Sequence, residues 1–221
     1  MATRKHVLVM SYPAFGHYIP MLSVAERIIP HHDVTFVVSA SKANDIRKRG
    51  LLPPAPIRFH TFDDELTINL DENFSQLRTL MDIMYDQAPR YARFIGSLNR
   101  AGSPLPHVDA VFCDIFNHAP CQPCRDNGIP LYIVSVLPAM LIAGGTRVTK
   151  DTPTVSDDTF FSSAAAGEEK DMTNPPMQES SKIINLDGIE AIKCCKAILF
   201  NSFEDLEPGA IQTLHDIPCM K

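Results

Sequence analysis

Short apolar runs that alternate with helical patterns constrain the fold of this chain more than any other feature of its sequence. Six runs have the length of a strand: 6–12, 33–39, 57–62, 108–113, 131–136 and 196–201. Runs that are apolar nearly throughout are typical of parallel strands covered by helices on both faces. The sequence therefore predicts an α/β fold, a doubly wound, Rossmann-like domain with a mostly parallel sheet.

The segments between these runs supply the helices. Gly50 and Gly128 are expected to end two of them, and Pro89 is expected to bend or divide a third. Helices are predicted over 19–29, 41–50, 73–98, 118–128, 137–145, 186–195 and 207–215.

The stretch from about 149 to 182 differs from the rest of the chain. It is rich in Ser, Thr, Asp, Glu and Pro and has few large apolar residues. This composition predicts a long mobile loop rather than a second domain. We therefore expect residues 1–221 to form a single domain.

Composition excludes several classes of partner. The chain has 221 residues, 45% of them hydrophobic, and a net charge of −6, with no basic cluster larger than "IRKRG" at 46–50. Nucleic acid is therefore not an expected partner. No run approaches the roughly 18 apolar residues of a membrane span, and Val7 to Met10 is too short for a signal peptide. We expect a cytoplasmic protein without a membrane partner.

The chain contains six cysteines: Cys113, Cys121, Cys124, Cys194, Cys195 and Cys219. In a cytosolic protein they are expected to be thiols. The CxxC spacing of "CQPC" at 121–124 leaves a redox pair or a zinc site as alternatives. A zinc site would need a second pair of ligands, and adjacent Cys194 and Cys195 lack the usual spacing.

The carboxyl ends of parallel strands are where ligands bind in such sheets. The loop after the first strand, "SYPAFGH", contains one glycine, Gly16, where a dinucleotide site needs three. An NAD site is therefore disfavoured. The loop offers instead His17, at the start of a helix whose dipole favours the neutral imidazole.

Asp114 ends the fourth strand on the same edge of the sheet. A carboxylate that holds one imidazole nitrogen would orient His17 as a general base. Because no GxSxG occurs, activation of a substrate hydroxyl is favoured over acyl transfer. The alternative is that His17 only caps the helix and Asp114 only forms a turn.

Three segments, in this order along the chain, resemble one family. They are "HVLVMSYPAFGHYIPMLSVAERI" at 6–28, "VDAVFCDIFNHAPCQPCRDNGIP" at 108–130 and "AILFNSFEDLEPGAIQTL" at 197–214. Together they resemble the N-terminal domain of family 1 UDP-glycosyltransferases, in particular the soluble plant-type enzymes. The first segment carries that family's pattern at Pro13, Gly16, His17, Pro20, Met21, Leu22 and Ala25.

The resemblance implies one half of a GT-B architecture, in which the N-terminal domain binds the acceptor. It implies that His17 is the base and Asp114 its partner, and that a hydroxyl attacks a UDP-sugar in one inverting displacement. It implies no metal and no cofactor beyond the UDP-sugar co-substrate. The implied acceptor is an apolar, hydroxylated small molecule.

The sequence departs from the family in one respect. It has no Trp and none of the family's donor-binding signature. The chain is therefore expected to be inactive alone and to need a C-terminal donor domain, in the full-length protein or in trans. The alternative is a stand-alone small-molecule binding or carrier protein.

Candidate acceptor-binding residues follow the strand ends and the long helix. They are Phe15, Gly16, Tyr18, Met84, Tyr85, Phe116, Asn117, Met140 and Leu141. Plain core packing is the alternative for the aromatic and apolar side chains among them. Neither the acceptor nor the donor sugar can be identified from these residues.

Overall fold

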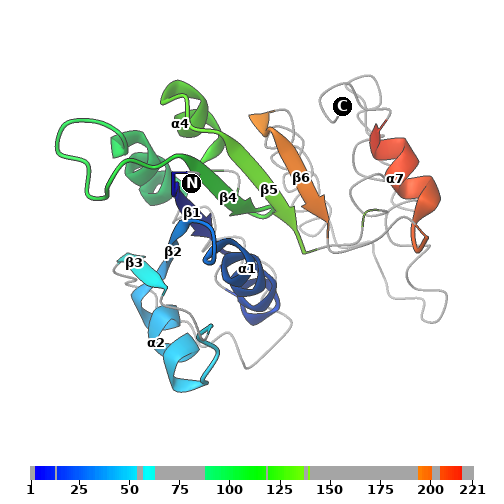
Figure 1. The fold of residues 1–221 in the computed structure, drawn as a ribbon, viewed down its shortest axis with the longest axis horizontal. Coiled ribbons are helices and arrows are strands. Elements are labelled where there is room, and N and C mark those ends of the chain that lie inside the picture. The colour runs from blue at the N-terminus through cyan, green and yellow to red at the C-terminus, as the bar shows by residue number, and fades with distance from the viewer. Residues whose placement is uncertain are drawn as a thin grey trace, which may run out of the picture.

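In the computed structural model the described residues are 3–12, 14–53, 57–62, 88–117, 119–136, 139, 194–200 and 205–215. They form a six-stranded sheet in the order β3-β2-β1-β4-β5-β6, in which all neighbouring strands are parallel (Figure 1). The strands are β1 (His6–Met10), β2 (Asp33–Ser39), β3 (Arg58–Phe62), β4 (Ala110–Asp114), β5 (Leu131–Ser135) and β6 (Ala197–Phe200). The predicted doubly wound α/β fold is confirmed.

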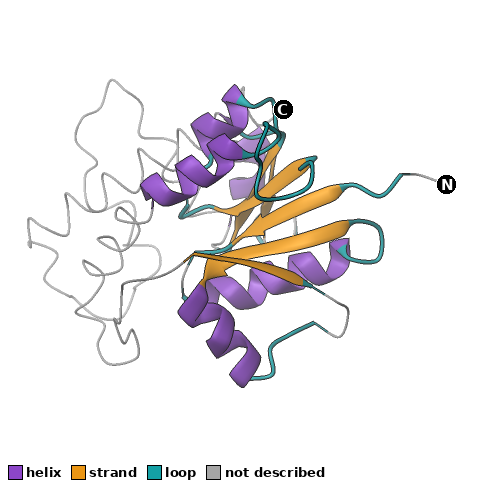
Figure 2. Ribbon diagram, turned by 90° about the vertical axis from the view of Figure 1, so that its left-hand side faces the viewer, coloured by secondary structure: helices purple, strands orange, loops and turns teal. Residues whose placement is uncertain are grey.

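Helices cover both faces of this sheet (Figure 2). They are α1 (Phe15–Ile28), α2 (Ala40–Lys48), α4 (Cys121–Asp126) and α7 (Pro208–His215), together with a helical stretch over 88–97. The helix expected over 73–98 is confirmed only for its last third, because residues 73–87 lie outside the described part. Of the helix expected over 137–145, the structure describes only residue 139. The loop expected over 149–182 lies wholly outside the described residues.

The four inner strands β2, β1, β4 and β5 bury side chains on both faces, which is why their apolar runs are nearly continuous. Leu8 and Met10 of β1 point to one face, and Val7 and Val9 point to the other. The α4-side cluster contains Leu8, Met10, Val37, Tyr91, Phe94, Ile95, Leu98, Val108, Val111, Cys113, Ile115, Cys121, Cys124, Ile129, Leu131, Ile133 and Ala139. The α1-side cluster contains Val7, Val9, Tyr18, Met21, Leu22, Ala25, Ile29, Val34, Phe36, Val38, Ala43, Ile46 and Val134.

The two predicted glycine stops are confirmed. Gly50 follows α2 with φ +66° and Gly128 follows α4 with φ +64°, a left-handed conformation that favours glycine. The N–H of Leu51 then bonds to the carbonyl of Ile46, and the N–H of Ile129 bonds to that of Cys124. These bonds satisfy carbonyl groups at the helix ends and turn the chain back toward the sheet.

The start of α1 differs from the prediction. The helix begins at Phe15 rather than at 19, so Pro20 lies in its second turn and not in its first. Ala14, the N-cap residue, has an extended backbone and makes no side-chain hydrogen bond to the helix. Since Pro20 has no N–H, the Gly16 carbonyl loses its usual donor four residues later.

Arg4 connects the amino end of the sheet to the end of α1 through hydrogen bonds. Its Nη2 donates to the carbonyls of Ile29 at 3.0 Å and His32 at 2.7 Å, and its Nη1 donates to that of Pro30 at 3.2 Å. Its Nε lies 3.1 Å from Asp33 Oδ1. Both side chains of this ion pair are half exposed, so the pair itself adds little to stability. We therefore attribute the stabilising effect of Arg4 mainly to its hydrogen bonds with the carbonyl groups after α1.

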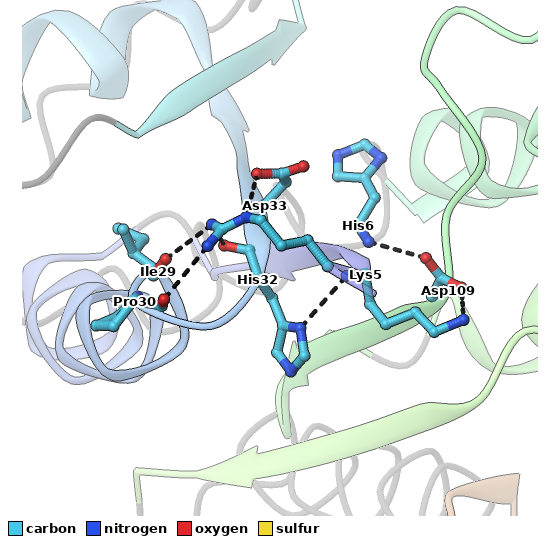
Figure 3. Close-up of polar contacts among 8 residues, drawn as sticks. Lys5, His6, Ile29, Pro30, His32, Asp33 and Asp109 are labelled. Atoms are coloured by element: carbon cyan, nitrogen blue, oxygen red, sulfur yellow. Dashed lines mark hydrogen bonds and ion pairs between the residues drawn. The ribbon is translucent and has the colours of Figure 1, made fainter. Parts of the chain in front are cut away.

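Asp109 holds the N-terminal segment against β4 at the same end of the sheet. Its Oδ2 accepts the backbone N–H of His6 at 2.8 Å, and its Oδ1 accepts Lys5 Nζ at 3.0 Å (Figure 3). The hydrogen bond from His6, followed by the charges of Lys5 and His107, holds the pKa of Asp109 below its usual value of 3.8. The ionised form of Asp109 is therefore favoured in the folded chain.

This lowered pKa predicts how stability depends on pH. Ionised Asp109 contributes fully to the free energy of unfolding above the pKa that it has in the unfolded chain, near 3.8. This contribution is lost as the pH falls through the lower pKa that it has in the folded chain. We expect Asp109→Asn to lower the free energy of unfolding at neutral pH, and the difference from the unsubstituted chain to shrink in acid. Urea unfolding at several pH values measures this, with Asp126→Asn as the surface-charge control. A difference that is constant with pH would contradict it.

Within the described part of the chain, no helix has both the length and the apolar character needed to cross a membrane.

Candidate active site

The sheet changes direction of winding between β1 and β4. From β1 the chain proceeds outward through β2 to β3, and then returns to add β4, β5 and β6 on the other side (Figure 1). Ligands of open α/β sheets bind at the carboxyl ends of the strands at such a switch point. The residues that follow β1 and end β4 are therefore placed where a ligand would bind.

His17 and Asp114 lie on the two sides of this switch point. His17 is in the first turn of α1, directly after β1, and Asp114 is the last residue of β4. Because Met10 pairs with Cys113, the two strands end side by side. His17 Nδ1 lies 2.8 Å from Asp114 Oδ2, although the two residues are 97 positions apart.

The two side chains differ in their access to solvent. The Asp114 side chain is 0% exposed, whereas that of His17 is 18% exposed. In the neutral imidazole, an Nδ1–H that donates to the carboxylate leaves the lone pair on Nε2. Among the described residues, none forms a hydrogen bond with Nε2. The geometry thus presents a buried anion behind an accessible imidazole.

The turn after β4 fixes the other oxygen of Asp114. Asp114 Oδ1 accepts the N–H of Phe116 at 2.9 Å, and the Asp114 carbonyl accepts the N–H of Asn117 at 2.9 Å. Cys113 closes the turn, since its Sγ donates to the Asn117 carbonyl at 3.0 Å. Both carboxylate oxygens therefore have partners, which a buried charge requires.

Two aromatic rings, which also contact each other, pack against the imidazole. The His17 ring centroid is 5.0 Å from that of Tyr12 and 5.1 Å from that of Phe116, both in edge-to-face arrangements. Burial, with a smaller contribution from the charge of Asp114, raises the pKa of Tyr12, so its phenol stays neutral. These contacts restrict the rotation of the imidazole beyond what its hydrogen bond achieves.

Phe15 and Tyr18 make packing contacts of their own on α1, and their expected contact with an acceptor stays a prediction. They are three residues apart on α1, so they share a face, and their rings meet at 5.6 Å. Tyr18 is 0% exposed in the α1-side cluster. Phe15 packs against the same cluster beneath the Arg49 guanidinium, 4.0 Å from its ring centroid. Tyr18 is therefore part of the core, whereas Phe15 is only partly buried against it.

Of the other predicted acceptor-binding residues, the structure describes three. Phe116 is partly buried beside His17, Gly16 is exposed, and Asn117 is buried at 5% exposure with its backbone in the turn after β4. Met84, Tyr85, Met140 and Leu141 lie outside the described residues, so their expected place beside an acceptor stays a prediction. Tyr12 was not among the candidates, although it follows β1 directly and its position in the chain could have pointed to it.

The cysteines are thiols wherever they are described. Cys113, Cys121, Cys124, Cys194 and Cys195 are free, and Cys219 lies outside the described part. The structure, as far as it is described, brings no three His, Cys, Asp or Glu side chains together in a metal-binding cluster. Among the described residues, no further ligands for a zinc ion therefore lie beside "CQPC".

No family model matches the sequence, but curated proteins and solved structures are similar to it. UDP-glycosyltransferase 72B3 of Arabidopsis thaliana is 24% identical over 225 residues, which cover 96% of this chain and 46% of that protein. UDP-glycosyltransferase 72B2 of the same plant is 25% identical and is covered to 47%. The chain thus spans about half the length of the curated relatives it matches.

Solved structures agree with these relatives. A UDP-glucosyltransferase from Polygonum tinctorium, described as capable of glucosylating indoxyl and bound to 3,4-dichloroaniline, matches all of this chain and 51% of its own, with a TM-score of 0.69 at 23% identity. Over nearly its whole length the chain is thus similar to about half of these plant UDP-glycosyltransferases, and its α/β fold matches that of about half of the solved UDP-glucosyltransferase.

Proposed function

We propose that the chain is the acceptor-binding half of a UDP-glycosyltransferase, which transfers a sugar from a UDP-sugar to a hydroxyl of an apolar small molecule. The observation that carries this proposal is the contact of 2.8 Å between His17 Nδ1 and Asp114 Oδ2 at the switch point of the sheet. A His–carboxylate pair at this place suits the removal of a proton from a bound hydroxyl.

In the proposed reaction, His17 Nε2 accepts the proton of the acceptor hydroxyl. The hydroxyl oxygen attacks the anomeric carbon of the sugar, and the bond from that carbon to UDP breaks in the same displacement. Asp114 holds the tautomer with the proton on Nδ1 and stabilises the imidazolium that forms. The buried position of this carboxylate strengthens its effect on the ring, because little water screens it.

An apolar acceptor fits the surroundings of the imidazole. The rings of Tyr12 and Phe116 contact both the imidazole of His17 and each other, and aromatic rings favour apolar and aromatic ligands. Two solved relatives support this class: one was crystallised with 3,4-dichloroaniline, and Phytolacca americana UGT2 was crystallised with pterostilbene and UDP-2fluoro-glucose. We extend the class, not the compounds, to this chain.

We assign the UDP-sugar site to a second domain, because the chain corresponds to about half of each relative. The donor domain would face the carboxyl end of the sheet and supply the electrophile. On this proposal, residues 1–221 alone bind acceptor but do not transfer sugar.

The proposal is tested by comparing the chain alone with a fusion to the C-terminal half of UDP-glycosyltransferase 72B3. Each is mixed with radiolabelled UDP-glucose and a small phenol, and glycoside formation and phenol binding are measured. We expect the phenol to bind to both proteins and transfer to occur only in the fusion. Transfer by the chain alone would contradict the division into halves. Binding without transfer, in a fusion that still binds UDP, would support the carrier alternative instead.

A further inference from the structure

Four cysteines from two distant segments lie together on the face of the sheet away from α1. Cys121 and Cys124 belong to α4, and Cys194 and Cys195 immediately precede β6. Cys121 and Cys124 are members of the α4-side cluster, and Cys194 and Cys195 pack against it. Figure 1 shows α4 and the start of β6 at the same end of the sheet. The glycosyl-transfer proposal uses none of these thiols.

Cys194 differs from the cysteines of α4 in its surroundings. The Arg125 Nη2 donates to its Sγ at 2.6 Å, and the residue is only partly buried. A guanidinium beside sulfur stabilises the negative charge of a thiolate, which is the form that attacks disulfides. Burial instead raises the pKa of Cys124 to about 12 and also raises that of Cys121, so these two stay protonated. Cys194 is therefore the thiol suited to react first.

Cys121 is the neighbour that can react second. Arg125 follows it by four residues, so the two side chains lie on the same face of α4, and Arg125 contacts Cys194. After burial, the charge of Cys194 contributes most to the raised pKa of Cys121, ahead of Cys124 on the same helix. The contact of Arg125 with Cys194 and the apolar cluster that both cysteines adjoin place Cys194 on the same side of α4 as Cys121.

We propose that Cys194 is a modification site for low-molecular-weight disulfides such as oxidised glutathione, and that Cys121 then displaces the bound thiol to form a Cys121–Cys194 disulfide. In the first step the Cys194 thiolate attacks the reagent's S–S bond, and one glutathione leaves as a thiolate. In the second step Cys121 loses its proton to the solvent and attacks the Cys194 sulfur, and the second glutathione leaves. The reagent gains two electrons and the protein loses two.

The product would join α4 to the segment before β6 through two cysteines that are 73 residues apart along the chain. Formation of the second bond is expected to be slow, because Cys121 must first be deprotonated in a buried place. The mixed disulfide at Cys194 should therefore accumulate before the crosslink. The CxxC pair, Cys121 with Cys124, is not the pair that we expect to close.

The test treats the full chain with excess oxidised glutathione, blocks free thiols at intervals and maps the products by peptide mass spectrometry. We expect a glutathionyl group on Cys194 at early times and a Cys121–Cys194 crosslinked peptide later, both reversed by dithiothreitol. Cys194→Ser should lose both products, and Cys121→Ser should retain the mixed disulfide without the crosslink. Cys195→Ser, the matched control next to Cys194, should leave both products unchanged.

Arg125→Gln should slow the first modification severalfold while circular dichroism shows an unchanged fold. Equal rates in Arg125→Gln and the unsubstituted chain would overturn the role of Arg125. A Cys121–Cys124 disulfide, or modification of Cys194→Ser at the rate of the unsubstituted chain, would overturn the site. Substitution of buried Cys121 could prevent folding, but Cys194 is partly exposed, so Cys194→Ser should fold. The loss of the mixed disulfide in Cys194→Ser therefore tests the site independently of Cys121→Ser. The readout follows sulfur chemistry alone and does not depend on sugar transfer.

Discussion

Replacing His17 by alanine is expected to lower kcat/KM for sugar transfer by the fused protein about 10²–10⁴-fold, the usual contribution of a general base. The loss should appear in kcat, because the imidazole acts on the proton during the displacement and does not hold the acceptor. The free energy of unfolding should fall much less than it does for a core residue, since the side chain is partly exposed.

His31→Ala is the matched control, because His31 is an exposed histidine after the end of α1. It removes an imidazole of the same size from the amino end of the sheet and should leave transfer unchanged. Phenol binding by His17→Ala, measured by equilibrium dialysis, should stay within a few-fold of that of the unsubstituted fusion. If His17→Ala keeps kcat within tenfold, the role of His17 as base is wrong.

The second large effect is expected for Asp114→Asn, which keeps the size of the side chain and removes its charge. The amide oxygen can still accept the N–H of Phe116, but the amide nitrogen would then face His17 Nδ1. A donor at this place shifts the ring proton to Nε2, the atom that must accept the substrate's proton. We expect kcat to fall by about 10²-fold or more.

The same substitution should also lower the free energy of unfolding by about 1–3 kcal/mol, because a hydrogen bond to a buried charge is lost. Asp33→Asn is the control, since it removes a carboxylate from the opposite end of the sheet. Transfer assays and urea unfolding of both variants separate the two effects. Asp114→Asn with near-normal kcat would show that the carboxylate is only structural.

The sheet could be predicted from sequence because its four inner strands are buried on both faces. The run at 33–39 has the same bounds as β2, and the stops at Gly50 and Gly128 were visible because left-handed backbone favours glycine. The meeting of His17 and Asp114 was also predictable. It follows from parallel strands whose carboxyl ends lie on one edge.

The face of α1 could not be predicted in the same way. Ala14 gives no capping signal, so the sequence predicts a loop at 15–18, where side chains follow no helical period. In the helix, Phe15 and Tyr18 turn into the α1-side cluster while His17 turns toward Asp114. The contact of Arg125 with Cys194 joins residues 69 positions apart and has no local sequence signal.

The pairing of Met10 with Cys113 has a consequence for the chemistry of the site. Successive side chains of a strand point to opposite faces, so a shift of β4 by one residue against β1 would place Cys113 where Asp114 now meets His17. The reactive pair is thus specified by strand register, which hydrogen bonds along the whole strand determine. Residues that never approach a substrate, including those that hold Asp109 and the N-terminal segment in place, share in setting a distance of 2.8 Å at the other end of the sheet.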